Sequence, residues 1–207
     1  MKMQCLPVGM LQANCYLIWD DDLCACAIDP GGDANRIFTF LQKEELNLAA
    51  ILLTHGHFDH VGGAKDLAEL TEATIYCSDY IIPVLTGKEP DFSGYPIPAV
   101  PSTQVKTIAG GDKLPVGSFS VKAIATPGHT PGDLTYEIDG NLFCGDLLFW
   151  GSVGRTDFPG GDFPTLLNSV KELTEIYPAE TQVYPGHSES TILGEEISSN
   201  PFLQGLK

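Results

Sequence analysis

All five histidines of this 207-residue chain lie in three short segments whose spacing suits a metal centre. They are His55, His57 and His60 in the segment 54–60, followed much later by His129 and His187. Neutral imidazole is the commonest protein ligand for zinc and related metals. Asp59 and Asp146 add carboxylate oxygens to this set of nitrogens. The sequence therefore predicts a metalloenzyme site, which the fold must assemble from distant segments.

Short apolar runs alternate with turns along the chain, and this pattern predicts an α/β protein. Strands are expected at residues 14–19, 23–28, 49–53, 119–125, 134–138, 141–144 and 181–184, and helices at 33–45, around 67–70, at 164–176 and at 191–198. We expect Asp33 to cap the first helix, Asp139-Gly140 to form a hairpin turn, and the proline-rich residues 83–103 to form a long surface loop near the site. Both halves place strands before helices and both donate histidines. We therefore expect a single domain over 1–207, with two sheets packed face to face and helices outside.

The composition fits one folded domain, because 43% of the residues are hydrophobic and 18% are charged. With 27 acidic and 11 basic residues, the formal charge is −16, which argues against a nucleic-acid partner. No apolar stretch approaches the roughly 20 residues of a membrane helix, and the first residues do not resemble a signal peptide. These features predict a cytoplasmic protein with no membrane partner. The six cysteines form no CxxC pair and are expected to be free thiols; the oligomeric state stays open.

The segment 54–60 resembles the HxHxDH motif of the metallo-β-lactamase superfamily. The later elements follow in that family's order: Asp29 in an Asp-Pro-Gly turn, His129, Asp146 and His187. This resemblance covers nearly the whole chain. It implies an α/β fold of four layers, an αββα sandwich, with the site at one edge of the two sheets.

The resemblance also implies a role for each ligand. His55, His57 and His129 would hold the first metal ion; Asp59, His60 and His187 would hold the second; and Asp146 would bridge the two. Three protein ligands per metal leave a position open for water, which is typical of a catalytic site. We expect two divalent metal ions, with zinc first and iron or manganese as alternatives, because histidine and carboxylate ligands suit all three.

Three further residues are expected near the metals. Asp29 is expected to brace the site loop rather than bind metal, and Thr54 to support the ligand loop through a hydrogen bond. Arg155 has two interpretations: it contacts a substrate carboxylate, or it pairs with Asp157 or Asp162 and holds its own loop.

Within the superfamily, the chain resembles the short, single-domain bacterial type of glyoxalase II-like enzyme. Residues 14–17, 29–32, 154–162 and 200–203 carry this resemblance. Full-length glyoxalase II adds a C-terminal helical domain that supplies much of its glutathione contact, whereas 20 residues follow His187 here. The resemblance therefore implies thioester hydrolysis more strongly than specificity for glutathione.

We expect a metal-dependent hydrolase that cleaves a small-molecule thioester such as S-D-lactoylglutathione. A metal-bridging hydroxide, oriented by Asp59, would attack the acyl carbonyl. The thiolate would then leave without help from a strong general acid. Asp59 is therefore the expected catalytic residue.

Three alternatives stay open. Persulfide dioxygenases of the same superfamily share a Gly-Arg-Thr-Asp-Phe segment and use one iron, whose ligands would here be His55, His129 and Asp146. A lactonase is the second alternative. The third, a non-enzymatic binding protein, is disfavoured because every ligand position is present. Iron content with oxygen consumption on a persulfide, ring-opening assays and metal-binding measurements would separate them.

Overall fold

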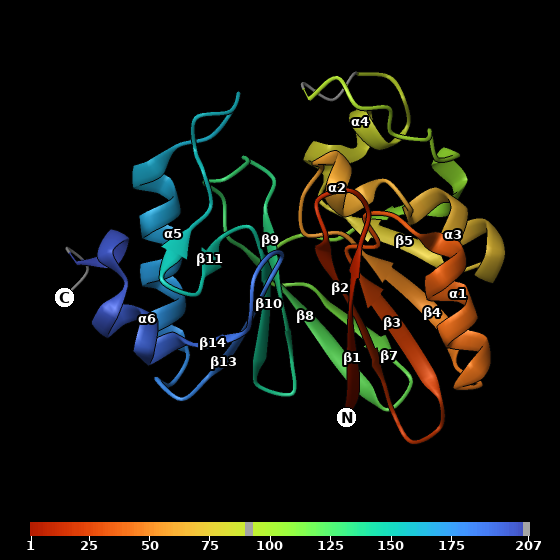
Figure 1. Ribbon diagram of the computed structural model, residues 1–207, viewed down its shortest axis with the longest axis horizontal. Helices are drawn as coiled ribbons and strands as arrows, with labels where there is room; N and C mark the ends of the chain where they lie inside the picture. Colours follow the sequence, from red (N-terminus) through yellow and green to blue (C-terminus); the bar gives the residue numbers. More distant parts are fainter. Residues whose placement is uncertain (90–92, 205–207) are drawn as a thin grey trace.

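Two six-stranded sheets, stacked face to face, form the centre of the computed structural model, which describes residues 1–89 and 93–204 (Figure 1). The first sheet has the order β1 (Lys2–Val8), β2 (Ala13–Trp19), β3 (Cys24–Ile28), β4 (Asn47–Leu52), β5 (Thr74–Cys77) and β6 (Val105–Thr107). The second has the order β14 (Thr191–Ile192), β13 (Gln182–Pro185), β10 (Asn141–Gly145), β9 (Leu134–Ile138), β8 (Phe119–Ala125) and β7 (Lys113–Val116). A separate hairpin joins β11 (Leu148–Phe149) to β12 (Ser152–Val153).

Helices cover the outer face of each sheet (Figure 1). The first sheet is covered by α1 (Ala34–Lys43) and α3 (Ala64–Thr71), and the second by α5 (Phe163–Ile176) and α6 (Leu193–Ser199). The remaining helical segments are short: α2 (Phe58–Val61), η1 (Asp79–Ile81), α4 (Ile82–Leu85), η2 (Ser102–Gln104) and η3 (Pro201–Leu203). The predicted four-layer αββα sandwich is confirmed.

Strand β2 shows why the layers stack as they do. Cys15 and Leu17 point to the helices and join the core that contains Ile37 of α1. Tyr16 and Ile18 point the other way and join the core between the sheets. Side chains alternate along a strand, so an almost continuously apolar strand must be covered on both faces. Each large buried side chain stabilises the fold by about 1.5–3 kcal/mol.

Several local predictions are confirmed. Strands β2 and β3 pair as an antiparallel hairpin, and Asp139-Gly140 turns the chain between β9 and β10. Asp139 and Gly140 have φ angles of 50° and 77°, the left-handed conformation of a tight hairpin turn. All six cysteines are free thiols.

Other local predictions need correction. Asp33 has φ 51° and its side chain does not cap α1; the carboxylate instead accepts a hydrogen bond from the Gly9 amide at 3.0 Å. The predicted helix at 191–198 begins only at Leu193, because Thr191 pairs with Val183 in the sheet. The expected loop at 83–103 is interrupted by α4 and η2, and its residues 90–92 lie outside the described part of the chain.

The sheet topology brings the ligand segments to one edge. Segment 54–60 follows β4, whose neighbours β3 and β5 run parallel to it. In the second sheet, β8, β10 and β13 all run in one direction, and each is followed by a predicted ligand. Two backbone hydrogen bonds join the sheets there: Leu134 N to Thr54 O at 2.8 Å, and Asn14 N to Gly186 O at 2.7 Å. The carboxyl ends of these strands therefore meet at one seam.

Candidate metal centre

Three imidazole nitrogens converge at the seam. His57 Nδ1 lies 3.1 Å from His55 Nε2 and 2.9 Å from His129 Nε2. His55 and His57 come from the loop after β4, and His129 comes from the loop after β8. A hydrogen bond can link only two of these nitrogens through one proton, whereas a metal cation can accept a lone pair from each of the three. These three residues form one group able to hold a metal ion.

A second group lies beside the first. His187 Nε2 lies 3.1 Å from Asp59 Oδ2, and His60 Nε2 lies 3.6 Å from the same oxygen. Helix α2 presents Asp59 and His60, and the turn after β13 presents His187. These three residues can also hold a metal ion.

Asp146 lies between the two groups. Its Oδ1 is 3.4 Å from His60 Nε2, and its Oδ2 is 3.7 Å from His129 Nε2 and 3.8 Å from His187 Nε2. The carboxylate therefore faces ligands of both groups. The structure brings all seven residues predicted as metal ligands together at this seam.

Two buried atoms at the centre have no hydrogen-bond partner: His60 Nε2 and Asp146 Oδ1. Leaving a buried polar atom unpaired costs about 1–3 kcal/mol, so such atoms call for an explanation. Both face the second group, where a divalent cation would accept their lone pairs. The donor set and these two atoms fit the binding of metal ions.

Asp29 and Thr54 orient His60 and His55 through contacts with the ring nitrogens that face away from the two ligand groups. The Asp29 carboxylate accepts hydrogen bonds from Thr54 N at 2.8 Å and Thr54 Oγ1 at 2.6 Å, and its Oδ2 lies 2.9 Å from His60 Nδ1. Thr54 Oγ1 also lies 3.0 Å from His55 Nδ1. Although Asp29, His55 and His60 are close enough to form a third group, both Asp29 oxygens are already engaged. The predicted bracing role of Asp29 is confirmed, and it leaves the Nε2 atoms of His55 and His60 free to bind metal.

Arg155 supports the centre mainly through its backbone. Its carbonyl oxygen lies 2.7 Å from His129 Nδ1, so the other ring nitrogen of His129 faces the metal group. Its guanidinium makes two hydrogen bonds of 2.7 Å to Asp157 and lies 3.7 Å above the Phe158 ring, which packs edge-on against His57. The ion pair is the loop-holding interaction foreseen for Arg155. The sequence contains no signal for the carbonyl contact, because every residue carries a carbonyl group.

The pKa values of the histidines and of Asp59 differ between the two ligand groups. Burial, followed by the surrounding imidazoles, lowers the pKa of His55 well below its usual value and that of His57 to about 4; burial also lowers the pKa of His129. Burial opposes a charge on His60, but the surrounding carboxylates raise its pKa to about 10. Burial would raise the pKa of Asp59, yet its histidine neighbours lower it to about 2. Neutral imidazoles and ionised carboxylates are the forms that bind metal, so a metal ion bound by His60 has to displace the proton that the carboxylates favour there.

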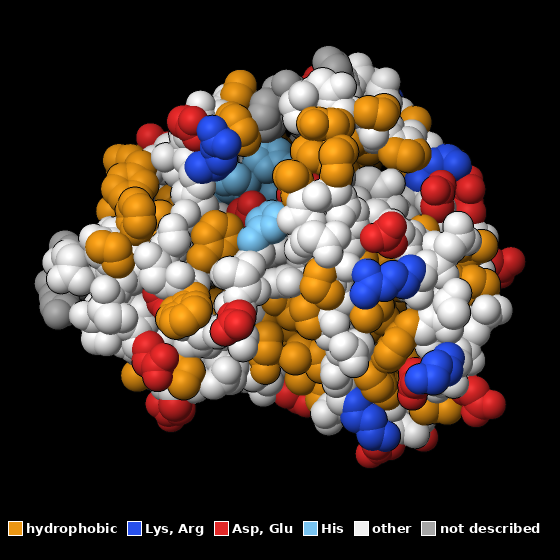
Figure 2. All heavy atoms as spheres, viewed as in Figure 1, with side chains coloured by type: hydrophobic (Ala, Val, Ile, Leu, Met, Phe, Trp, Pro, Cys, Tyr) orange, Lys and Arg blue, Asp and Glu red, His pale blue; other side chains and the backbone are white. Residues whose placement is uncertain are grey.

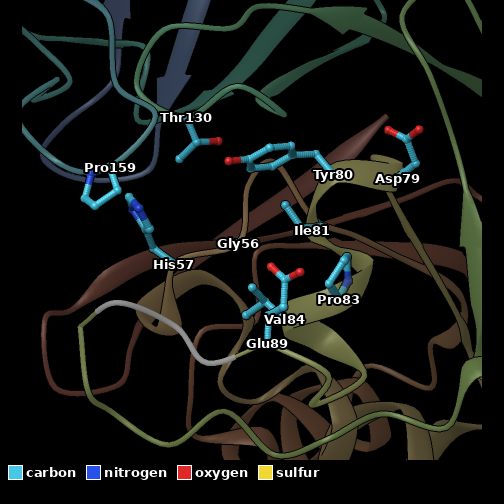
Figure 3. A pocket seen from close by; sticks show the side chains of 10 residues that line it. All are labelled: Gly56, His57, Asp79, Tyr80, Ile81, Pro83, Val84, Glu89, Thr130 and Pro159. Carbon is cyan, nitrogen blue, oxygen red and sulfur yellow. The ribbon is translucent and has the colours of Figure 1, made fainter.

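A cleft of about 560 Å³ opens beside the first group. Its lining residues are Gly56, His57, Asp79, Tyr80, Ile81, Pro83, Val84, Glu89, Thr130 and Pro159 (Figure 3). The space-filling view shows histidine side chains at the bottom of a hollow whose border includes both hydrophobic side chains and a Lys or Arg side chain (Figure 2). Such a cleft gives a substrate access to His57. The sequence patterns did not indicate Tyr80 or Glu89, because neither belongs to a motif.

An αββα sandwich with buried histidine and aspartate groups at the joined edges of its sheets defines a metallo-hydrolase of the β-lactamase type. The sequence model of the metallo-beta-lactamase superfamily matches residues 8–187, and the chain belongs to that superfamily. Within the described residues, no helix has the length and apolar character needed to cross a membrane.

Two curated relatives match over almost their full lengths. YqgX of Bacillus subtilis (strain 168), a probable metallo-hydrolase, is 36% identical over 212 residues, which cover 100% of this chain and 99% of the relative. GloC of Haemophilus influenzae, a hydroxyacylglutathione hydrolase, is 37% identical, and the match covers 98% of each chain.

Solved structures share the fold. The BLEG-1 B3 metallo-beta-lactamase has a TM-score of 0.88 and 37% identity, with 99% of this chain and 100% of that chain covered. TTHA1623 in a di-iron-bound form has a TM-score of 0.86 and 37% identity, with 97% and 100% covered. ETHE1 from Myxococcus xanthus has a TM-score of 0.79 and 29% identity, with 97% and 84% covered.

Proposed function

We propose that this protein is a thioesterase that hydrolyses small-molecule thioesters such as S-D-lactoylglutathione with two divalent metal ions. The observation that carries the proposal is the pair of ligand groups on either side of Asp146, beside an open cleft. His55, His57 and His129 are proposed to hold one ion, and Asp59, His60 and His187 the other, with Asp146 shared between them. Zinc is the first choice of metal, and the di-iron form of TTHA1623 makes iron the leading alternative.

When bound, two neighbouring divalent ions activate water and withdraw charge from the acyl carbonyl. Residues of this chain accept the hydrogen bond from water and orient the ligands. Asp59, with a pKa of about 2, stays ionised and accepts a hydrogen bond from the attacking water. Asp29 and Thr54 hold His60 and His55 in orientation. As the new C–O bond forms, the C–S bond breaks and the thiolate leaves; this leaving group needs no strong acid beside it.

The cleft is proposed to hold the thiol half of the substrate, because it begins at His57 and continues along α4. The 37% identity to a hydroxyacylglutathione hydrolase supports a thioester. A substrate-binding role for Arg155 stays a prediction. Its charge is balanced by Asp157, so a substrate carboxylate would have to compete with that ion pair.

The direct test follows loss of the thioester from S-D-lactoylglutathione by the metal-loaded protein. We expect turnover that a chelator abolishes and added zinc restores. His57→Ala, which removes a ligand of the first group, should lower turnover by at least about 100-fold, in line with the loss of a metal ligand. Absence of thioester cleavage by protein with two bound metal ions would contradict the proposal.

An iron-dependent persulfide dioxygenase is the second candidate. It is favoured by the presence of His55, His129 and Asp146, the residues that match its iron ligands, of which His129 and Asp146 lie 3.7 Å apart. Oxygen consumption on a persulfide by the iron-loaded protein would identify this activity. Ring-opening assays on lactones complete the comparison, and the substrate is in every case a small molecule rather than nucleic acid or a membrane.

A further inference from the structure

The cleft beside the metal centre has an unusual charge for a protein expected to act on glutathione thioesters. Two of its ten lining residues, Asp79 and Glu89, are acidic, and none of the ten is lysine or arginine. Glutathione carries two carboxylates and one ammonium group. An acidic cleft in a chain with a net charge of −16 repels the carboxylates.

Glu89 is the acidic residue that faces the interior of the cleft. Figure 3 shows its carboxylate directed toward the middle of the cleft, whereas the Asp79 carboxylate lies at the far edge. Apolar residues, Ile81 and Val84 among them, line the wall beside Glu89. An acidic group next to an apolar wall suits a ligand that has both a positive charge and a hydrocarbon surface.

Tyr80 adds a second observation that points to the same kind of ligand. Its side chain is 52% exposed although the residue lies inside the cleft wall. Figure 3 shows the ring between Thr130 and Ile81, on the opposite side of the cleft from Glu89. An exposed tyrosine ring attracts cations through its π face, and quaternary ammonium groups are typical ligands of such rings.

We propose that this cleft selects thioesters whose thiol half carries a positively charged ammonium group and no carboxylate, and that Glu89 and Tyr80 determine this specificity. The inference rests on the proposed thioesterase function. The acyl group meets the metal centre at His57, and the cationic end of the thiol half lies between the Glu89 carboxylate and the Tyr80 ring. A single opposite charge about 4 Å away in a water-like environment favours binding by about 5-fold.

Three acetyl thioesters of similar length, with thiol halves of different charge, test the proposal. They are acetylthiocholine, which is cationic; S-(3,3-dimethylbutyl) thioacetate, its neutral carbon counterpart; and S-acetyl-2-mercaptoethanesulfonate, which is anionic. We expect kcat/KM to fall in that order, by about 5-fold at each step at low ionic strength. Salt should reduce the differences, because the cleft is open to solvent.

Variants of Glu89 and Tyr80 test whether these two residues cause the preference for a cationic thiol half. Glu89→Gln should bring the ratio of cationic to neutral kcat/KM close to 1, and Glu89→Lys should invert it. Tyr80→Leu should lower kcat/KM for acetylthiocholine more than for the neutral thioester. Glu175→Gln is the matched control, because Glu175 is an exposed residue of α5 that does not line the cleft, and it should keep the wild-type ratio. Thermal melting checks that each variant is folded.

A binding measurement separates this inference from the proposed function. Choline and its neutral counterpart 3,3-dimethylbutan-1-ol are compared on the metal-loaded protein by ligand-observed NMR. Choline should bind about 5-fold more tightly, and Glu89→Gln should remove the difference. Equal binding of the two, or a charge ratio unchanged in Glu89→Gln, would overturn the inference. If neither S-D-lactoylglutathione nor any of the three acetyl thioesters is cleaved, the proposed function fails, and the choline measurement alone decides whether the cleft selects ammonium groups.

Discussion

Asp29 and His60 are joined by a contact of 2.9 Å between Oδ2 and Nδ1, and both side chains are almost completely buried. Asp29 follows β3 and His60 belongs to α2, so the contact spans 31 residues of sequence. Because Nδ1 is engaged, the lone pair of His60 Nε2 points to the second ligand group. The orientation of one predicted metal ligand therefore depends on a residue that follows a neighbouring strand.

Replacing Asp29 tests this dependence. Asp29→Asn keeps the shape of the side chain but removes its charge and one acceptor, so Thr54 and His60 can no longer both be satisfied. We expect the affinity for the second metal ion to fall by about 10- to 100-fold. Stability should fall by about 1–3 kcal/mol. Zinc titration against a competing chelator and urea unfolding measure the two effects. Asp22→Asn, in the exposed turn between β2 and β3, is the control and should change neither.

Asp59 is expected to serve both the second metal ion and the attacking water. Asp59→Ala should abolish most turnover and lower the metal content from two ions toward one, because His60 and His187 would keep no carboxylate partner on α2. Metal analysis and thioester hydrolysis on the same preparation check both effects. Asp66→Ala, on the exposed side of α3, should behave as wild type. An Asp59→Ala protein with unchanged rate and metal content would refute the assignment.

Gly31 allows the Asp-Pro-Gly turn to pack directly against the backbone of α2. A Cβ atom at Gly31 would lie 1.5 Å from the backbone oxygen of Asp59, and backbone cannot yield as a flexible side chain can. Gly31→Ala should therefore destabilise the protein by more than about 3 kcal/mol, at or beyond the upper end for overpacked sites, and weaken metal binding.

Gly151 provides the control for this substitution. Its φ is 68° and a Cβ atom there would meet no other atom within 4 Å. Gly151→Ala should cost only the about 1–2 kcal/mol of a left-handed residue and should leave metal affinity unchanged. Similar losses of metal affinity in the two variants would contradict the role given to Gly31.

Asp133 is expected to make stability depend on pH. It is buried and accepts hydrogen bonds from the amide and hydroxyl of Thr130, yet burial raises its pKa to about 7. The folded pKa exceeds the unfolded value near 4, so the favourable contribution of Asp133 is complete below about pH 4 and is lost as the pH rises through 7. The slope is at most about 1.4 kcal/mol per pH unit.

Asp133→Asn removes this titration. Relative to wild type, the variant should gain stability as the pH rises from 5 to 7, as measured by urea unfolding of the chelator-treated protein. Asp22→Asn should run parallel to wild type over the same range. Parallel curves for Asp133→Asn and wild type would show that Asp133 stays ionised in the folded protein.

Much of the fold could be predicted because its signals are local. The apolar run at 14–19 predicts a strand through its own residues, and Asp139-Gly140 specifies its turn by tolerating positive φ. The seven-residue strand β1 escaped prediction, and so did the shortest strands, among them β5 and β6 with four and three residues. Segments of that length carry too few alternations to define a period, and neighbouring strands hold them in the sheet.

The motif 54–60 and the order of the later ligands determined which residues are candidates for metal binding, because each lies in a short, distinctive segment. Only the tertiary structure decided how these residues are oriented. Asp29 contacts His60, the Arg155 carbonyl contacts His129, and Glu89 lies in the cleft that begins at His57. These contacts depend on the order and direction of strands in two stacked sheets. Local sequence preferences do not specify that order. Only the folded structure therefore shows which residues, distant in the sequence, come into contact.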